Sequence, residues 1–332
     1  MKIKKKLDPA YANLGPDEIL NALNSLNYRD NGEILALNSY ENRVYRLGLE
    51  DDSNIVIKFY RPKRWSDLAI KEEHHFAQEL VKLDIPIIEP MKIDNKTLHY
   101  YKSFRFSLWK CFGGRAPDLD NDEILKQLGR LVARIHLHSE MSRFEYRPNL
   151  DIHSYGYQST KFLLENSFIP PDIDEAYRSI IDDLFTNIKR CFTACGSYKI
   201  FKIHGDLHPS NILTQDKTIK IVDLDDARNG PAIQDLWMFL SGERAEQERQ
   251  MNLLLDGYEE FRTFNYRELH LIESLRSLRI LHYTSWIAKR WNDPAFKIAF
   301  PWFGTPRFWD DHILSLREQL SLTQEPPLNL SL

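Results

Sequence analysis

Two short stretches of this chain combine the residue types that phosphoryl transfer requires. The first is His204-Gly205-Asp206-Leu207-His208-Pro209-Ser210-Asn211, and the second is Ile221-Val222-Asp223. Phosphoryl transfer to a hydroxyl needs a carboxylate that accepts the hydroxyl proton and oxygen ligands that hold magnesium. Asp and Asn are ordinary turn residues when they occur singly. In this order and spacing, however, they predict a catalytic loop at Asp206 and metal ligands at Asn211 and Asp223.

The elements around these stretches are expected to be strands and helices that hold them in place. Alternating apolar residues predict a strand over Tyr198–Ile203 that leads into the loop, and a second strand over Thr218–Val222. Strong helical patterns cover Asn121–Glu140 and Asp174–Cys195. Asp235 is predicted to begin a further helix, where a carboxylate can cap free backbone amides.

Lys58 stands within a predicted strand, Ile55–Tyr60, where a lysine usually points to solvent. The next segment, Leu68–Leu83, is predicted to be a helix that carries Glu72 and Glu73. In kinase sites a strand lysine binds the α- and β-phosphates and is oriented by a glutamate of the following helix. We therefore expect Lys58 to bind nucleotide phosphates. Glu73 is favoured over Glu72 as its partner, because the apolar spacing places Glu73 beside the inward face of the helix.

The turn Asn38–Asn42 lies between two predicted strands and is the expected cover of the phosphates. It contains no glycine, so it lacks the glycine-rich signature of many phosphate-binding loops. Any hold on phosphate must come from backbone N–H groups and from the hydroxyl of Ser39. The alternative is a plain polar hairpin turn.

Length and composition restrict the class of protein further. With 332 residues, 42% hydrophobic and 28% charged, the chain can bury a large core, and its net charge of −4 gives no reason to expect nucleic-acid binding. No run of about 18 apolar residues occurs, so no membrane span is expected. The cysteines, Cys111, Cys191 and Cys195, are few and odd in number, which favours free thiols in a reducing compartment. We expect a cytoplasmic monomer.

Taken together, these residues resemble the aminoglycoside-phosphotransferase and choline-kinase branch of the protein-kinase-like superfamily. Within that branch the chain is similar to bacterial Ser/Thr protein kinases of the stress response, nearly from end to end. The most specific matches are Leu37–Tyr45, Val56–Pro62, Val222–Pro231, Trp291–Phe296 and Gln324–Leu328.

The resemblance implies an α+β, bilobal fold. Residues 1–110 would form a nucleotide-binding lobe with an antiparallel sheet and a helix, and residues 111–332 a mainly helical catalytic and substrate lobe. It also implies ATP and Mg²⁺ as cofactors. The γ-phosphate would pass to Ser or Thr of a protein substrate, the kinase itself included, in the response to envelope and oxidative stress.

The resemblance also implies a role for each site residue. Asp206 is the proton acceptor, and Asp223 is both a catalytic residue and, with Asn211, a magnesium ligand. The supporting residues follow in two sets: Ser39, Lys58 and Glu73 hold the nucleotide, and His204 and Asp235 support the loop.

One departure leaves the substrate class open. Ordinary protein kinases have lysine two positions after the catalytic aspartate, whereas this chain has His208, as the small-molecule kinases of the branch do. A kinase for amino alcohols, sugars or antibiotics is therefore one alternative, and a nucleotide-binding scaffold without turnover is another. The roles of Asp225, Asp226 and Arg228 also stay open, as site groups or as a hydrogen-bonded turn.

Overall fold

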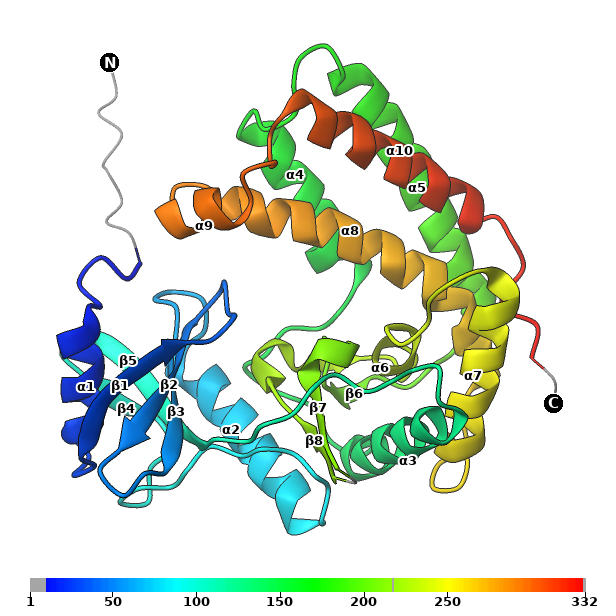
Figure 1. Cartoon of the computed structure of the whole chain (residues 1–332). Helices are drawn as coiled ribbons and strands as arrows, with labels where there is room; N and C mark the ends of the chain where they lie inside the picture. Colours follow the sequence, from blue (N-terminus) through cyan, green and yellow to red (C-terminus); the bar gives the residue numbers. More distant parts are fainter. Residues whose placement is uncertain (1–9, 217, 331–332) are drawn as a thin grey trace. The chain divides into compact units, whose positions relative to one another are not determined.

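The computed structural model describes residues 10–216 and 218–330, and its contacts divide the chain into two units (Figure 1). The first unit takes Leu213–Asp225 and Asn292–Ala299 in addition to the chain up to Arg115. The second unit takes Ala116–Ile212, Asp226–Trp291 and Phe300–Leu332. An antiparallel sheet forms the first unit and helices dominate the second, so the predicted α+β class is confirmed.

Five antiparallel strands form the sheet of the first unit, in the order β1-β2-β3-β5-β4. Alternate residues of β3, including Ile57 and Phe59, pack on one face against Leu23 of helix α1. Because side chains alternate across a strand, Lys58 points to the opposite face. The bounds are β1 Asp30–Ala36, β2 Arg43–Leu49, β3 Asn54–Phe59, β4 His99–Tyr101, β5 Phe104–Lys110 and α1 Pro16–Asn24.

Three further segments complete the first unit. Helix α2 (Asp67–Lys82) begins at Ser66, whose hydroxyl caps the backbone N–H of Ala69. The hairpin of β7 (Ile212–Gln215) and β8 (Thr218–Ile221) joins this unit from Leu213 onward. The backbone N–H of Ile221 donates to Pro86 over 2.8 Å. The third segment contains helix α9 (Pro294–Ala299).

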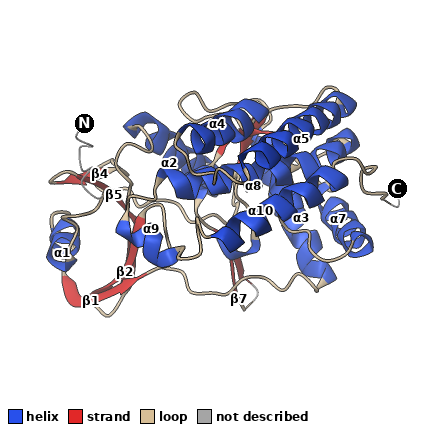
Figure 2. Cartoon of the chain, turned by 90° about the horizontal axis from the view of Figure 1, so that it is seen from above, coloured by secondary structure: helices blue, strands red, loops and turns tan. Residues whose placement is uncertain are grey.

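The second unit is built from packed helices around a short two-stranded sheet. Figure 2 shows α8 and α10 running beside α5, and all three have contacts with one another. Strand β6 (Phe201–Ile203) leads into the Asp206 loop and pairs with β9 (Arg228–Gly230). The helices are α3 Asp122–Ser139, α4 Gln158–Glu165, α5 Asp174–Cys195, α6 Gln234–Trp237, α7 Arg244–Tyr258, α8 Ile272–Lys289 and α10 Pro306–Leu322, and the short 3₁₀ and π turns are Ile152–Tyr157 (π), Pro209–Asn211, Leu224–Asp226 and Tyr266–Leu271.

Helices α3 and α7 approach so closely that their contact requires glycine. A Cβ atom on Gly129 would lie 1.9 Å from the Leu254 carbonyl oxygen, and one on Gly257 would lie 2.0 Å from that of Lys126. Both distances are far below van der Waals contact with backbone atoms, which cannot rotate away as a flexible side chain would. The close approach brings α3 and α7 together beneath the Asp206 loop.

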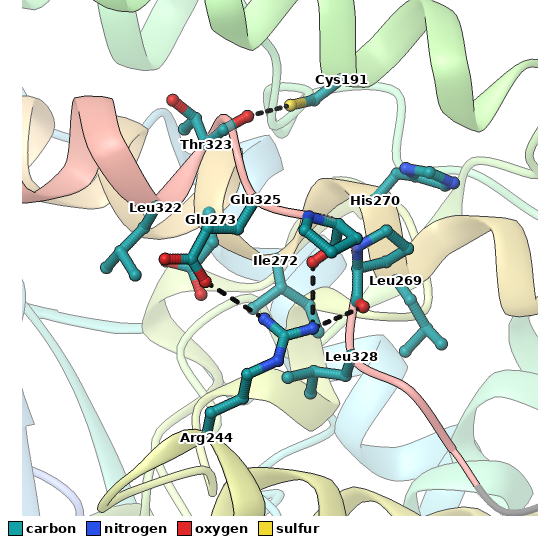
Figure 3. Close-up of a pocket in the computed structure, with 12 residues that line it drawn as sticks. Cys191, Arg244, Leu269, His270, Ile272, Glu273, Leu322, Thr323, Glu325 and Leu328 are labelled. Atoms are coloured by element: carbon teal, nitrogen blue, oxygen red, sulfur yellow. Dashed lines mark hydrogen bonds and ion pairs between the residues drawn. The ribbon is translucent and has the colours of Figure 1, made fainter.

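The segment after α10 folds back over the second unit as a strap, residues 324–328. Arg244 of α7 donates to the carbonyl oxygens of Pro326 and Pro327 over 3.1 and 2.7 Å, and it pairs with Glu325 over 3.4 Å (Figure 3). A cavity of about 50 Å³ remains between the strap, α5 and the start of α8. The strap thereby joins helices that are distant in sequence.

Two expectations need correction or completion. The predicted strand Tyr198–Ile203 is shorter, starting at Phe201, and its partner β9 was not foreseen. Asp235 does not cap the helix that contains it, because α6 has no side-chain cap. Across residues 10–216 and 218–330, none of the helices has the length and apolar content needed to cross a bilayer.

Candidate functional site

In the first unit, Lys58 is buried among three carboxylates. Its Nζ atom lies 3.0 Å from Oδ1 of Asp223 and 3.2 Å from Oδ1 of Asp225. Oε1 of Glu73 lies 3.6 Å away and is fully buried, whereas Glu72 is only half-buried. Burial lowers the pKa of Lys58, but the three carboxylates reverse that effect and leave it well above its ordinary value. Lys58 is therefore a fixed cation, and Glu73 is its helical partner.

Asp223 follows β8 in a backbone conformation that L-residues rarely adopt. Its φ angle is +61°, in the left-handed region, which is strained for a residue other than glycine. The backbone pairing of Ile87 with Ile221 fixes the hairpin immediately before it. The Asp223 side chain stays 52% exposed although one oxygen contacts Lys58. The strained turn thus holds a carboxylate at the surface with room for a further ligand.

A buried chain of ion pairs connects this cluster to the turn that contains Ser39. Arg64 pairs with Asp225 and lies 3.8 Å from Glu41. Arg61 lies 3.0 Å from a Glu41 oxygen and 2.7 Å from Oδ2 of Asp293, in the segment with α9. All of these side chains are at least 89% buried. We call this set the ion-pair chain: Lys58, Asp225, Arg64, Glu41, Arg61 and Asp293.

The turn Asn38–Asn42 contains no glycine, and hydrogen bonds with Arg61 of the ion-pair chain and with Arg43 hold its backbone. Asn42 Oδ1 accepts a hydrogen bond from the backbone N–H of Arg61 over 3.1 Å. Arg43 donates to the carbonyl of Tyr40 over 3.2 Å. Ser39 is half-buried and lines a hollow of about 280 Å³ whose other wall is α9. The turn is therefore fixed in one conformation with its hydroxyl at the edge of a hollow.

In the second unit, the loop that contains Asp206 is braced by Asp235. The two oxygens of Asp235 accept hydrogen bonds from the backbone N–H groups of His204 and Gly205, each over 2.8 Å. His136 of α3 lies 3.1 Å from the same carboxylate and 2.9 Å from the Tyr258 hydroxyl of α7. Asp235 thus caps the loop rather than its own helix. This explains how the close packing of α3 and α7 supports the loop.

Asp206 presents both carboxylate oxygens to cationic or ionisable groups. Arg279 of α8 forms an ion pair with Oδ1, and His208 Nε2 lies 3.5 Å from Oδ2. Burial raises the pKa of Asp206, but His208 and Arg279 outweigh it, and the net pKa lies below its usual range. Asn211 Nδ2 donates to the Asp206 carbonyl over 2.8 Å. That bond uses the amide nitrogen of Asn211 and leaves its amide oxygen available for another contact.

The structure brings the sequence-predicted residues together in two groups. Lys58, Glu73 and Asp223 meet in the first unit, and the turn that contains Ser39 is connected to them through Glu41 of the ion-pair chain. The other predicted residues are His204, Asp206, Asn211 and Asp235, which meet in the second unit.

Sequence reasoning missed several residues around these groups. Arg64 and Asp293 lie far in sequence from the residues they contact, and Arg279 is one of many arginines in a helical segment. Arg228, left open before, donates to Asp226 through its guanidinium over 2.6 Å, so these two residues pair with each other. Asp225, also left open before, pairs with Lys58 and Arg64.

Comparisons with known proteins relate the chain to a family and to a fold. A family model described as "Phosphotransferase enzyme family" matches residues 33–272. Stress response kinase A of Escherichia coli strain K12 is 38% identical over 321 residues, with 97% of each chain covered. The serine/threonine protein kinase RdoA of Salmonella typhimurium is 37% identical over the same share of both chains.

A solved structure shares the fold at much lower sequence identity. Amicoumacin kinase, in complex with AMP-PNP, Ca²⁺ and Ami, superposes with a TM-score of 0.70 at 17% identity. The match covers 94% of this chain and 95% of that one. The resemblance drawn from the sequence motifs is therefore confirmed at the levels of family and fold.

Proposed function

The chain belongs to the phosphotransferase enzyme family, and on that premise we propose that it is an ATP-dependent Ser/Thr protein kinase that also phosphorylates itself. The observation that carries the proposal is the 37–38% identity, over 97% of each chain, to stress response kinase A and the serine/threonine protein kinase RdoA. A role in the envelope and oxidative stress response, in the cytoplasm and as a monomer, belongs to the same proposal.

The residues of the second unit suit the acceptor half of the reaction. Asp206 accepts the proton as the Ser or Thr oxygen attacks the γ-phosphorus of ATP. The new O–P bond forms while the bond from that phosphorus to ADP breaks, and ADP leaves with the electron pair. Asp235 keeps the loop backbone in place through its two hydrogen bonds to His204 and Gly205.

The residues of the first unit suit the nucleotide half. Lys58, held by Glu73, is a buried cation that can bind the α- and β-phosphates. The backbone of the fixed Asn38–Asn42 turn and the Ser39 hydroxyl can donate hydrogen bonds to phosphate oxygens. Nucleotide phosphates would compete with Asp223 for the Lys58 ammonium and so release an oxygen of that carboxylate.

The donor set fits magnesium. Asp223 offers a half-exposed carboxylate and Asn211 an amide oxygen, and Mg²⁺ prefers such hard oxygen ligands. Over the described residues no group of three or more His, Cys, Asp or Glu gathers as a metal site. Two protein ligands together with substrate phosphates are the usual way in which proteins hold this ion. When bound, Mg²⁺ neutralises the charge that develops on the phosphates.

The experiment is transfer of label from [γ-³²P]ATP to the protein itself and to proteins of a cell extract. We expect Asp206→Asn to lower transfer roughly 10²- to 10⁴-fold while nucleotide binding persists. Asp216→Asn is the matched control, because Asp216 is an exposed turn residue of the β7–β8 hairpin. A wild-type enzyme that labels no protein would refute the proposal.

A small-molecule hydroxyl kinase is the second candidate. The observation in its favour is His208 two positions after Asp206, together with the fold shared with amicoumacin kinase. Incubation with a metabolite pool and with amino alcohols, sugars and aminoglycosides separates the two candidates. Phosphorylated small molecules without labelled protein would select this one, and nucleotide binding without any transfer would select a scaffold.

A further inference from the structure

Arg279 contacts the carboxylate on which the proposed reaction depends. The residue lies on α8, 73 positions after Asp206, and its Nη1 atom pairs with Asp206 Oδ1. The sequence of the loop does not by itself predict that a cation from α8 contacts Asp206. The ion pair leaves Oδ2, the oxygen near His208, as the carboxylate oxygen available to a hydroxyl.

Helix α8 presents Arg279 from a rigid position. The flanking Leu278 and Leu281 are fully buried in the second unit. One turn further, His282 stacks on Tyr155 with ring centroids 4.1 Å apart. The Arg279 and Asp206 side chains are 38% and 23% exposed, so the pair is partly shielded from water. An arginine fixed at its backbone in this way restricts the rotation of the carboxylate that it binds.

The other groups near Asp206 cannot restrict it equally. His208 lies 3.5 Å from Oδ2, at the outer limit of a hydrogen bond, and its imidazole is not a permanent cation, so it restricts the carboxylate less than Arg279 does. Asp226 repels the carboxylate, but its own charge is paired with Arg228. The backbone of the loop is held by Asp235 and Asn211, and neither of them touches the Asp206 carboxylate in a described hydrogen bond.

We propose that Arg279 is the positioning residue of the acceptor half-site: its guanidinium holds Oδ1 of Asp206 so that Oδ2 faces the acceptor hydroxyl. The proposal rests on the proposed function, in which Asp206 is the proton acceptor. Arg279 keeps its own protons throughout the transfer. Its contribution is orientation, and misplacement of a catalytic group by about 1 Å can cost roughly 10²-fold in rate.

The test is a set of variants measured for kcat, KM for ATP and nucleotide affinity. We expect Arg279→Gln to lower kcat roughly 30- to 300-fold and to leave KM for ATP within about twofold. Arg279→Lys restores most of kcat. Arg276→Gln is the matched control, since Arg276 lies one turn earlier on α8 and pairs with Glu273.

Several results would overturn the proposal. If Arg279→Gln is as fast as the wild type or faster, Arg279 only occupies the acceptor position. A loss confined to KM for the acceptor makes Arg279 an acceptor-binding residue instead. Loss of nucleotide binding and of thermal stability, without rescue by Arg279→Lys, makes its role purely structural.

Failure of the positioning role can be distinguished from failure of the proposed function. A wild type that labels small molecules rather than proteins refutes the protein-kinase proposal, and the same variants are then compared on that acceptor or on ATP hydrolysis. A crystal structure of Arg279→Gln gives a readout that needs no activity. The Asp206 side chain in its wild-type rotamer there would refute the positioning role, and a changed or disordered rotamer would support it.

Discussion

The Lys58 cluster and the Asp206 loop are held by different forces. In the first unit, ion pairs hold the side chains: Lys58 is buried with Glu73, Asp223 and Asp225. Positive and negative side chains continue to alternate along the ion-pair chain. In the second unit, one carboxylate, Asp235, holds the loop mainly through backbone N–H groups. Removing or adding one charge changes the first arrangement directly, whereas the second depends on two hydrogen bonds to the backbone of the loop.

Under the proposed function, the difference indicates which group of residues is already arranged before substrates bind. A loop fixed by backbone hydrogen bonds needs no reorganisation when substrates bind, which favours transition-state stabilisation. A cluster in which Lys58 already binds Asp223 must exchange partners before the lysine can contact phosphates. We therefore expect changes in the first unit to alter nucleotide affinity and stability, and changes in the second to alter turnover.

The largest effect is expected from Lys58→Met. The change leaves Glu73, Asp223 and Asp225 without their shared cation, and an uncompensated buried charge costs about 3–5 kcal/mol. Urea unfolding measures the free energy of unfolding, with the exposed Lys82→Met as control. Adding Asp225→Asn should recover part of the loss. A cost below about 1 kcal/mol would show that the cluster is solvated and the contrast between the units overstated.

A smaller effect on the free energy of unfolding is expected from the titration of Glu268, a buried acid of the second unit. Burial raises the pKa of Glu268 to about 7, and the residue accepts a hydrogen bond from Ile233, just before α6. The protonated form is favoured in the folded state, so its contribution to stability is full below pH 4.5 and is lost as pH rises to about 7. The loss amounts to at most about 3 kcal/mol.

Glu268→Gln keeps a neutral acceptor at this position and should remove the pH dependence. The measurement is the free energy of unfolding of both proteins from pH 4.5 to 8, taken as a difference so that other titrating groups cancel. A difference that does not change with pH would mean that Glu268 is ionised in the folded state.

The smallest stability effect is expected from Asp235→Asn. The amide can accept one of the two loop hydrogen bonds but presents N–H to the other donor, which costs about 2 kcal/mol. Turnover should fall far more than ATP affinity, since the Lys58 cluster is untouched. Calorimetry with a nucleotide and a transfer assay check this, with the exposed Asp256→Asn as control. Equal losses of binding and turnover would contradict the division between the two halves.

The site residues that follow from short sequence spacing could be predicted from the sequence. The loop from His204 to Asn211, the strand lysine and the choice of Glu73 all follow from motif order or helical periodicity. The residues that sequence reasoning missed have distant partners. Arg64 pairs with Asp225 across 161 positions, Arg61 with Asp293 across 232, and neither spacing has a periodicity to detect. The local pattern assigned the cap of Asp235 to its own helix, because its actual donors lie 31 and 30 residues earlier, and only the family resemblance implied that Asp235 supports the loop.

The segment with Asp293 has a consequence for the order in which the chain can fold. The first unit needs Asn292–Ala299 to pair with Arg61, so during synthesis its ion-pair chain stays incomplete until nearly all of the second unit has emerged. Contacts between such distant residues form slowly, because a long loop must close before they can contribute. We therefore expect the sheet to form early and the nucleotide-binding half of the site to acquire its final geometry late.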